Sequence, residues 1–321
     1  MAGGARMGSA EWAMLLALSL LWGASFFFAK VALAALPPLT LVLGRTGIAA
    51  AALFLGMRIA GYRFPAEAGK WRRYLVMGLL NNVLPFTLLT WSQTEIASGL
   101  ASILNALTPL STALLGHLLA REERLTPAKL SGILVGIAGA AVVVGPAFLL
   151  GLGRHLPAEL AALAATLCYA SAGLYGRRFK GEAPMVTATG QLVASASVLL
   201  PLSLFLDRPW QLALPGASAW GALVGLALFS TALAYILYFR ILARAGATNV
   251  LLVTFLMPPT TLLLGALFLG ERARASELAG MGLIFAGLAL VDGRILRCLR
   301  GRRATRPSGE APPSQWAGGR T

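Results

Sequence analysis

The sequence predicts an all-α polytopic membrane protein with ten transmembrane helices, arranged as two inverted five-helix repeats. Hydrophobic residues make up 57% of the 321 residues and charged residues only 12%, about half of the share that soluble domains carry. The few charges are gathered between apolar runs of about 20 residues, the length that crosses ~30 Å of hydrocarbon as a helix. A set of landmark residues also recurs once along the chain, which predicts the repeat.

Ten apolar segments account for nearly the whole chain. They are expected near residues 12–35, 39–60, 73–93, 97–119, 128–147, 157–176, 185–206, 217–240, 247–269 and 277–294. Turn-forming residues separate most of them, for example Pro37-Pro38 after the first and Thr126-Pro127 before the fifth. Residues 1–11 precede the first span. Residues 295–321 form a short basic tail, rich in Gly, Pro and Ser, that we expect to be disordered.

The net charge of +15, from 27 Lys and Arg against 12 Asp and Glu, fits membrane orientation better than nucleic-acid binding. Most basic residues fall in loops on the side of the N-terminus. The basic residues expected in the opposite loops are Arg154, Arg208, Arg272 and Arg274. Because loops rich in Lys and Arg stay in the cytoplasm, we expect both termini there. Membrane lipid is therefore an expected partner, and nucleic acid is not.

Landmarks in the fourth and fifth spans recur in the ninth and tenth. The first copy is Pro109, Gly116, Glu122, Gly132 and Gly139, and the second is Pro258, Gly265, Glu271, Gly280 and Gly287. The repeats are expected at residues 12–147 and 157–294. Since each holds five spans, an odd number, the second copy must run upside down in the membrane. Inverted repeats are typical of secondary transporters, which use them to alternate access to one central site.

Several motifs resemble the EamA-type family of the drug/metabolite transporter superfamily. The matching residues are Trp22-Gly23-Ala24-Ser25-Phe26, Lys30, Pro37, Arg45, the stretch from Ser230 to Arg240, Ala245-Gly246-Ala247 and Leu269-Gly270-Glu271. The resemblance covers about residues 12–292. It implies a ten-helix carrier in a bacterial-type inner (plasma) membrane that exports amino acids or other small organic metabolites. The sequence departs from the pattern at Arg121, where the second copy has Gly270, and the second copy has no clear equivalent of Arg45.

Polar residues inside a span are costly and point to water, solute or a partner helix. One stripe in the fourth span consists of Ser98, Ser102, Asn105, Pro109 and Thr112, and the ninth span repeats part of it as Thr254, Pro258 and Thr261. Each proline removes a backbone donor and frees a carbonyl one turn back. We expect these residues to line a pathway, with helix–helix joining as the alternative.

A second wall is expected from the third and eighth spans. Its members are Asn82, Phe86, Thr90 and Gln93, then Ser230, Ala234, Tyr235 and Tyr238, with Trp22, Ser25 and Tyr169 completing it. Such a wall offers hydrogen bonds and aromatic surface to an organic solute. For Trp22 and Tyr169, ordinary core packing is an equal alternative.

Lys30 and Arg45 are the basic residues expected inside spans. For Arg45 we expect attraction of a substrate carboxylate or control of the external gate, with outward snorkelling as the alternative for both residues. Glu122 and Glu271, at equivalent hairpins, are expected to cap the helix that follows or to pair with a nearby arginine such as Arg124 or Arg272.

The sequence carries no Walker A loop, no metal-ligand spacing and no Ser/His/Asp arrangement. We therefore expect no cofactor, no metal and no catalytic residue. A contrasting hypothesis is an integral-membrane enzyme acting on a lipid or isoprenoid, which would need titratable groups clustered at one membrane face. A third is a non-transporting partner subunit. The glycines at 132 and 136 leave a homodimer open, although an internal helix contact is the preferred reading.

Overall fold

The computed structural model describes residues 8–120, 126–145, 155–250 and 252–292. The first half contains α1 (Ser9–Ala32), α2 (Pro38–Ile59), α3 (Ala68–Gly78), the π-helix η1 (Leu79–Val83), α4 (Leu84–Glu95), α5 (Ser98–Asn105), α6 (Thr108–Ala120) and α7 (Pro127–Val144). The tail at 295–321 and the hairpin residues Arg121, Glu122 and Arg124 lie outside the described residues, so the expectations for them are not addressed.

The second half of the chain is also helical. It contains α8 (Leu156–Gly176), the short 3-10 helix η3 (Arg177–Phe179), α9 (Pro184–Leu202), the π-helix η4 (Ser203–Asp207), the 3-10 helix η5 (Pro209–Gln211), α10 (Ala217–Ala227), the π-helix η6 (Leu228–Leu233), α11 (Ala234–Ala245), α12 (Ala247–Val250), α13 (Val253–Phe268) and α14 (Ala275–Asp292). Within the described ranges all regular structure is helical.

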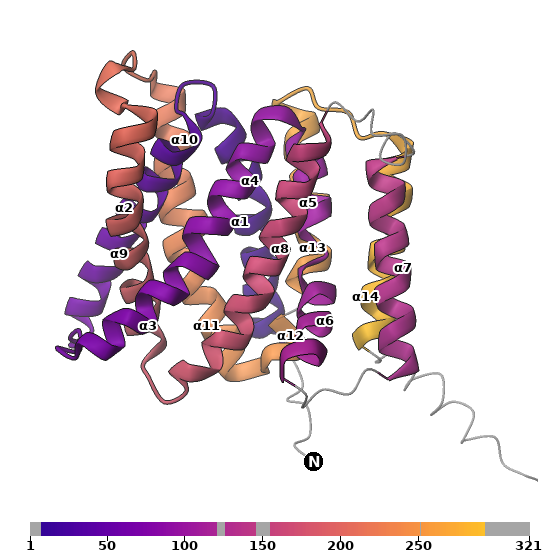
Figure 1. The fold of residues 1–321 in the computed structure, drawn as a ribbon, viewed down its shortest axis with the longest axis horizontal. Coiled ribbons are helices and arrows are strands. Elements are labelled where there is room, and N and C mark those ends of the chain that lie inside the picture. The colour runs from indigo at the N-terminus through magenta and orange to yellow at the C-terminus, as the bar shows by residue number, and fades with distance from the viewer. Residues whose placement is uncertain (1–7, 121–125, 146–154, 251, 293–321) are drawn as a thin grey trace, which may run out of the picture.

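The prediction of a ten-helix membrane protein is confirmed. Eight helical runs are long and apolar enough to cross a membrane, and the two shorter apolar helices, α13 and α14, fall where the ninth and tenth spans were expected. The helix ends lie within a few residues of the expected ones. The helices stand roughly side by side in one bundle (Figure 1).

The third and eighth spans are interrupted by a π-helix at the same relative place. In the third span Pro85 has no N–H to give to the carbonyl of Asn81, so regular α-helical bonding cannot continue through η1. In the eighth span Thr231 Oγ1 donates to the carbonyl of Leu226, five residues back, at 2.9 Å. Each interruption adds a residue to one turn and changes which side chains face the bundle interior.

The expected break at Pro109 is present in the fourth span, where α5 ends at Asn105 and α6 begins at Thr108. Proline cannot donate to the carbonyl of Asn105, and the hydroxyl of Thr108 donates to that oxygen instead, at 2.7 Å. The ninth span is also split, between α12 and α13, but not at Pro258, which lies inside α13.

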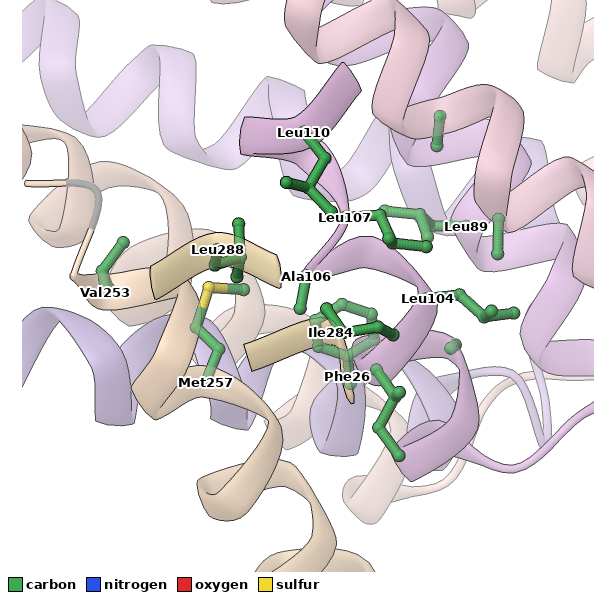
Figure 2. Packing of buried hydrophobic residues seen from close by; sticks show 14 of the residues in the cluster. Phe26, Leu89, Leu104, Ala106, Leu107, Leu110, Val253, Met257, Ile284 and Leu288 are labelled. Atoms are coloured by element: carbon green, nitrogen blue, oxygen red, sulfur yellow. The ribbon is translucent and has the colours of Figure 1, made fainter. Parts of the chain in front are cut away.

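The two sequence halves share their hydrophobic core. The largest cluster includes Leu107 and Leu110 from the first half and Met257, Ile284 and Leu288 from the second (Figure 2). Helices α7 and α14 lie side by side at one edge of the bundle (Figure 1). They approach so closely that a Cβ added at Gly132 would lie 2.6 Å from the Gly287 carbonyl oxygen. Gly132, which was expected to serve a helix contact, makes that contact within the chain, between α7 and α14.

The partner expected for Glu271 was wrong. Its carboxylate neither caps the following helix nor pairs with Arg272, but accepts from the backbone N–H of Ser98 at 2.9 Å and from the Ser98 hydroxyl at 2.7 Å. It thus caps the N-terminus of α5, in the other half of the chain. The start of α14 is capped by Glu277, which accepts from the N–H of Arg274 at 3.1 Å.

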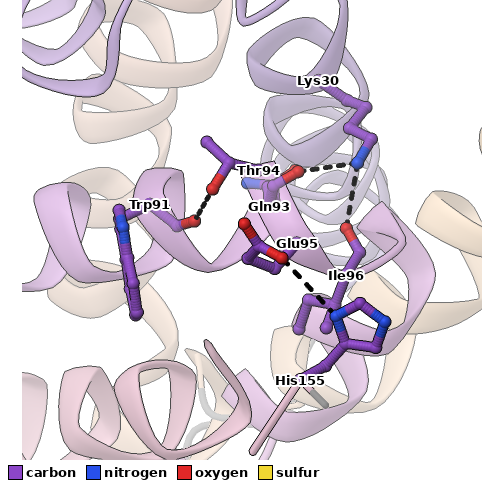
Figure 3. Close-up of polar contacts among 7 residues, drawn as sticks. All are labelled: Lys30, Trp91, Gln93, Thr94, Glu95, Ile96 and His155. Carbon is purple, nitrogen blue, oxygen red and sulfur yellow. Dashed lines mark hydrogen bonds and ion pairs between the residues drawn. The ribbon is translucent and has the colours of Figure 1, made fainter. Parts of the chain in front are cut away.

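Lys30 also does not snorkel freely. In the last turn of α1, its ammonium donates to the carbonyls of Gln93 at 2.6 Å and Ile96 at 3.0 Å, as Figure 3 shows. These carbonyls belong to the C-terminal end of α4, where a cation is favoured by the helix dipole. Beside it, Glu95 pairs with His155 at 3.6 Å. Lys30 and Glu271 therefore hold the two sides of the turn between α4 and α5.

Candidate functional site

Two equivalent helices each bring one long polar side chain into the bundle. Helix α2 begins at Pro38 and carries Arg45 seven residues later, and α9 begins at Pro184 and carries Gln191 seven residues later. At 1.5 Å per residue both lie about 10 Å from the start of their helix. Arg45 is 9% exposed and Gln191 is 1% exposed. Gln191 thus occupies the same place in α9, counted from the proline that begins the helix, as Arg45 does in α2.

The two π-helices face these side chains. Asn81 and Asn82 lie in η1, and Ser230 and Thr231 lie in η6. Because a π turn holds an extra residue, two neighbouring polar positions turn toward the interior in each span. Irregular helix turns of this kind are frequent at functional sites.

Arg45 is fixed by the other half of the chain. Its Nε–H donates to Oγ1 of Thr231 at 2.9 Å, and its guanidinium carbon lies 3.6 Å from the centre of the Phe86 ring. A cation over an aromatic face is attracted by the ring quadrupole, more strongly where water is excluded. No acidic side chain of the described residues forms an ion pair with Arg45. Burial contradicts the alternative in which Arg45 snorkels outward.

Gln191 makes the mirrored contact with η1. Its Oε1 accepts from Nδ2 of Asn81 at 3.2 Å. The hydroxyl of Tyr235 accepts from the same Asn81 Nδ2 at 3.1 Å and donates to Oδ1 of Asn82 at 2.7 Å. Asn82 then donates to Oγ of Ser195 at 3.0 Å. These groups form a closed hydrogen-bond chain between α9, η1 and α11.

We call these residues together the central polar cluster. Its members are Arg45, Asn81, Asn82, Phe86, Gln191, Ser195, Ser230, Thr231 and Tyr235. Each half of the chain contributes one long side chain from its second span and one π-helix from its third. Buried polar groups are expensive in a membrane unless they are paired, so a cluster of this size is a strong candidate for a binding site.

One member of the central polar cluster has a buried polar atom without a partner. Ser230 is fully buried, and its Oγ makes no hydrogen bond. Oδ1 of Asn105, at the end of α5, is likewise unpaired and buried. Most buried polar atoms in folded proteins do have a partner. Both residues were predicted from the sequence to face a solute, and both retain free hydrogen-bonding capacity.

The remaining aromatic candidates pack beside the cluster. Trp22 and Tyr238 lie with ring centres 5.6 Å apart, and Tyr169 packs against the hydrophobic cluster that contains Phe86 and Val83. Ser25 donates to the carbonyl of Trp22 at 2.6 Å, within its own helix. These residues form an aromatic wall made from α1, α8 and α11, with Trp22, Tyr169 and Tyr238 all half-buried.

The residues of the predicted polar stripe on the fourth and ninth spans do not all have the same role. Ser102 is buried and donates to the Gly99 carbonyl at 2.8 Å, which is a bond internal to α5. Pro109 is buried, Thr254 is half-buried at the start of α13, and Pro258 is buried within it. Thr90, which was predicted for the wall of the third and eighth spans, is also buried. The contacts described for these residues do not join them to the central polar cluster.

Thr261, another residue of the predicted stripe, has the alternative role of joining two helices. Its hydroxyl donates to the carbonyl of Gly23 at 2.9 Å and so joins α13 to α1. This part of the stripe serves helix joining.

A hollow of about 370 Å³ lies away from the cluster, between α1, η6 and α13. Its lining is Leu20, Leu21, Ala24, Phe28, Phe229, Thr260, Leu263 and Leu264. Leu20, Phe229 and Leu263 are exposed on the outer surface of the bundle. Nearly every lining group is apolar, so this hollow faces hydrocarbon and lacks groups that would orient a polar solute.

The groups of the central polar cluster are of the kind that can bind an organic solute. It offers one cation, several neutral donors and acceptors, and aromatic faces. Among the described residues no three His, Cys, Asp or Glu side chains gather where they could hold a metal ion. The acidic residues in the described ranges lie in loops or in the first or last turn of a helix.

Sequence reasoning missed four members of the cluster: Asn81, Gln191, Ser195 and Thr231. The signal for Gln191 was available, because the spacing from Pro184 to Gln191 equals that from Pro38 to Arg45. Asn81 and Thr231 were hidden by the assumption of regular α-helix, which places them on another face than Asn82 and Ser230.

Comparison with known proteins gives a family match over both halves. The model of the EamA-like transporter family matches residues 10–145 and again residues 156–292. The chain is 28% identical to a probable terminal-alkyne amino-acid exporter of Streptantibioticus cattleyicolor, covering 94% of this chain and 99% of that one. It is 30% identical to the protein PecM of Dickeya dadantii, covering 84% of this chain and 88% of PecM.

Similarity extends to further transporters and to a solved fold. The uncharacterized transporter YyaM of Bacillus subtilis is 26% identical, covering 88% of this chain and 93% of YyaM. A crystal structure superimposes with a TM-score of 0.63 at 22% identity, covering 93% of this chain and 100% of the other. That likeness concerns the fold.

Proposed function

Since the chain belongs to the EamA-like transporter family, a family of multi-pass membrane transporters, we propose that it exports amino acids or other small organic metabolites by alternating access. The proposal treats it as a secondary transporter that binds its solute at the central polar cluster. One relative of similar length is named as an amino-acid exporter, which supports the solute class and the direction.

The observation that carries the proposal is that each half of the chain forms a hydrogen bond to the other half at the central polar cluster. Arg45 of the first half bonds Thr231 of the second, and Gln191 of the second half bonds Asn81 of the first. A solute bound among these groups touches both halves at once. Rocking of one half against the other then exposes it first to one side and later to the other.

We propose that residues 12–147 and 157–294 are repeats of opposite orientation around this cluster. Two contacts to carboxylates support this. Glu11 at the start of α1 pairs with Arg244 at the end of α11, at 3.8 Å, and His155 at the start of α8 pairs with Glu95 at the end of α4, at 3.6 Å. Each joins the first span of one half to the third span of the other, at opposite ends of the bundle.

The proposed setting is the inner membrane with both termini in the cytoplasm, supported by the distribution of basic loops. In this orientation the Lys30 end of α1 faces outward. The residues proposed to line the solute pathway are Trp22, Ser25, Arg45, Asn82, Phe86, Thr90, Ser102, Asn105, Pro109, Tyr169, Ser230, Tyr235, Tyr238, Thr254 and Pro258, with Asn81, Gln191, Ser195 and Thr231 added from the geometry.

The test is solute flux across proteoliposomes that contain the purified full-length protein. A panel of labelled amino acids and small organic acids, alcohols and amides is loaded inside, with and without a proton gradient. We expect saturable efflux of at least one solute class, abolished in protein-free vesicles. Hydrolysis or group transfer on lipid or isoprenoid without flux would contradict the proposal and favour the enzyme alternative.

A further inference from the structure

Charge is unevenly distributed in the central polar cluster. The two equivalent positions seven residues into α2 and α9 hold a cation, Arg45, and a neutral amide, Gln191. The other members of the cluster are amides, hydroxyls and aromatic rings, so the cluster carries one positive charge, on Arg45, and no charge at the position of Gln191. A guanidinium stays protonated in proteins, even where it is buried.

Arg45 has donors left over. A guanidinium carries five N–H donors, and the hydrogen bond described for Arg45 uses Nε, directed to Thr231. The two terminal amino groups, Nη1 and Nη2, form the planar pair that suits a carboxylate in a two-point contact. The unpaired hydroxyl of Ser230, on the same π-helix as Thr231, is a further free donor of the cluster.

The neutral members of the cluster suit an uncharged group. Asn81, Asn82 and Gln191 present amide donors and acceptors around the Tyr235 hydroxyl. The Phe86 ring beside the guanidinium and the half-buried Tyr169 add apolar contact. A solute bound in the cluster therefore meets one cation, from α2, and neutral hydrogen-bonding groups from η1, α9 and α11.

Resting on the proposed function, and choosing between its two solute classes, we infer that the transported solute is not a free zwitterionic amino acid but an organic anion with one carboxylate and an otherwise uncharged body. We further infer that its export is electrogenic. The carboxylate binds the terminal amino groups of Arg45, and the uncharged body reaches toward Gln191. Each cycle then moves one negative charge outward.

The energetic consequence follows from the membrane potential. In a cell with a negative interior, outward movement of an anion is downhill. A potential of 100 mV corresponds to about 2.3 kcal/mol for one charge, which equals about a 50-fold concentration ratio at equilibrium. The potential alone can then drive export, with no coupling proton.

The test uses three probes that share one skeleton: N-acetyl-leucine, which is an anion, N-acetyl-leucinamide, which is neutral, and leucine, which is a zwitterion. Proteoliposomes of the full-length protein are loaded with each labelled probe in turn. A potassium gradient with valinomycin sets the interior potential at zero or at about −100 mV. We expect efflux of N-acetyl-leucine that exceeds that of the other two and rises at negative interior potential, toward a distribution shifted about 50-fold.

Variants of Arg45 and a matched control distinguish an effect on solute binding from an effect on folding. Arg45→Gln is expected to remove the preference for the anion, and Arg45→Lys, which keeps the charge but loses the planar pair of donors, is expected to retain part of it. Arg58→Gln, at the exposed end of the same helix, is the matched control and should leave preference and voltage response unchanged. The voltage response of the unmodified protein tests the inference even if Arg45→Gln does not fold.

The outcomes are distinct. If the protein transports leucine, N-acetyl-leucinamide or any other neutral or cationic solute of the wider panel in preference to anions, the inference is overturned and the transporter function stands. Anion flux that does not respond to potential also overturns it. Absence of flux for every solute of the panel rejects the proposed function itself, and the inference with it.

Discussion

The Nε–H of Arg45 donates to Oγ1 of Thr231 at 2.9 Å, although 186 positions separate the two residues in sequence. Thr231 lies on a π-helix, and its hydroxyl also donates to the carbonyl of Leu226. One hydroxyl thus completes the irregular turn and orients the buried cation. The position of Arg45 depends on a backbone irregularity in the other half of the chain.

Arg45→Ala is expected to lower transport without lowering membrane abundance. The change removes the cation of the cluster and a hydrogen bond to a charged group, which is worth about 1.5–3 kcal/mol, so initial flux should fall roughly 10- to 100-fold. Flux is measured in proteoliposomes matched for protein content, with Arg58→Ala as the control. Unchanged flux at equal abundance would reject a role for Arg45 in solute binding.

Tyr235→Phe is expected to weaken both transport and stability, because the hydroxyl is shared by Asn81 and Asn82. Leaving buried amides unpaired costs about 1–3 kcal/mol, which thermal unfolding in detergent can register as a lower midpoint. Combining it with Asn82→Ala should give a loss smaller than the sum of the single losses, because both variants break the same bond. Strict additivity would show that the two side chains act independently.

Gly132→Ala is expected to lower the unfolding midpoint by separating α7 from α14. The added methyl group would lie 2.6 Å from the Gly287 carbonyl oxygen, and overpacking of this kind costs about 1–3 kcal/mol. Gly282→Ala on α14 is the matched control, since nothing lies within 4 Å of a Cβ at that position. Equal midpoints for the two variants would contradict the close contact.

Glu271→Ala is expected to destabilise the turn that precedes α5, because its carboxylate accepts from the N–H and hydroxyl of Ser98. Loss of a helix N-cap costs about 0.5–2 kcal/mol. The control is Glu67→Ala, which removes an exposed ion pair with Lys70 that contributes little. Hydrogen exchange of the α5 amides should rise in Glu271→Ala alone, and equal exchange in both variants would count against the cap.

The spans were predictable because apolar runs and turn residues are local signals. Arg45 and Asn82 were also found, since a charge or an amide inside an apolar run is conspicuous. Asn81 was not, because a regular α-helix turns it away from Asn82 and only a π turn brings both inward. The partner of Glu271 lies 173 positions away, across the two halves, so nearby arginines seemed the better candidates.

The central claim is that the two halves open alternately at opposite ends. The most direct measurement uses paired cysteines in a background without Cys168 and Cys298, one pair at Glu95 and His155 and the other at Glu11 and Arg244, joined by a bifunctional thiol reagent. Bridging either pair alone should reduce solute flux to the level of protein-free vesicles, and a cleavable bridge should restore flux on reduction. Full flux with either end held closed would contradict alternating access around Arg45 and Gln191.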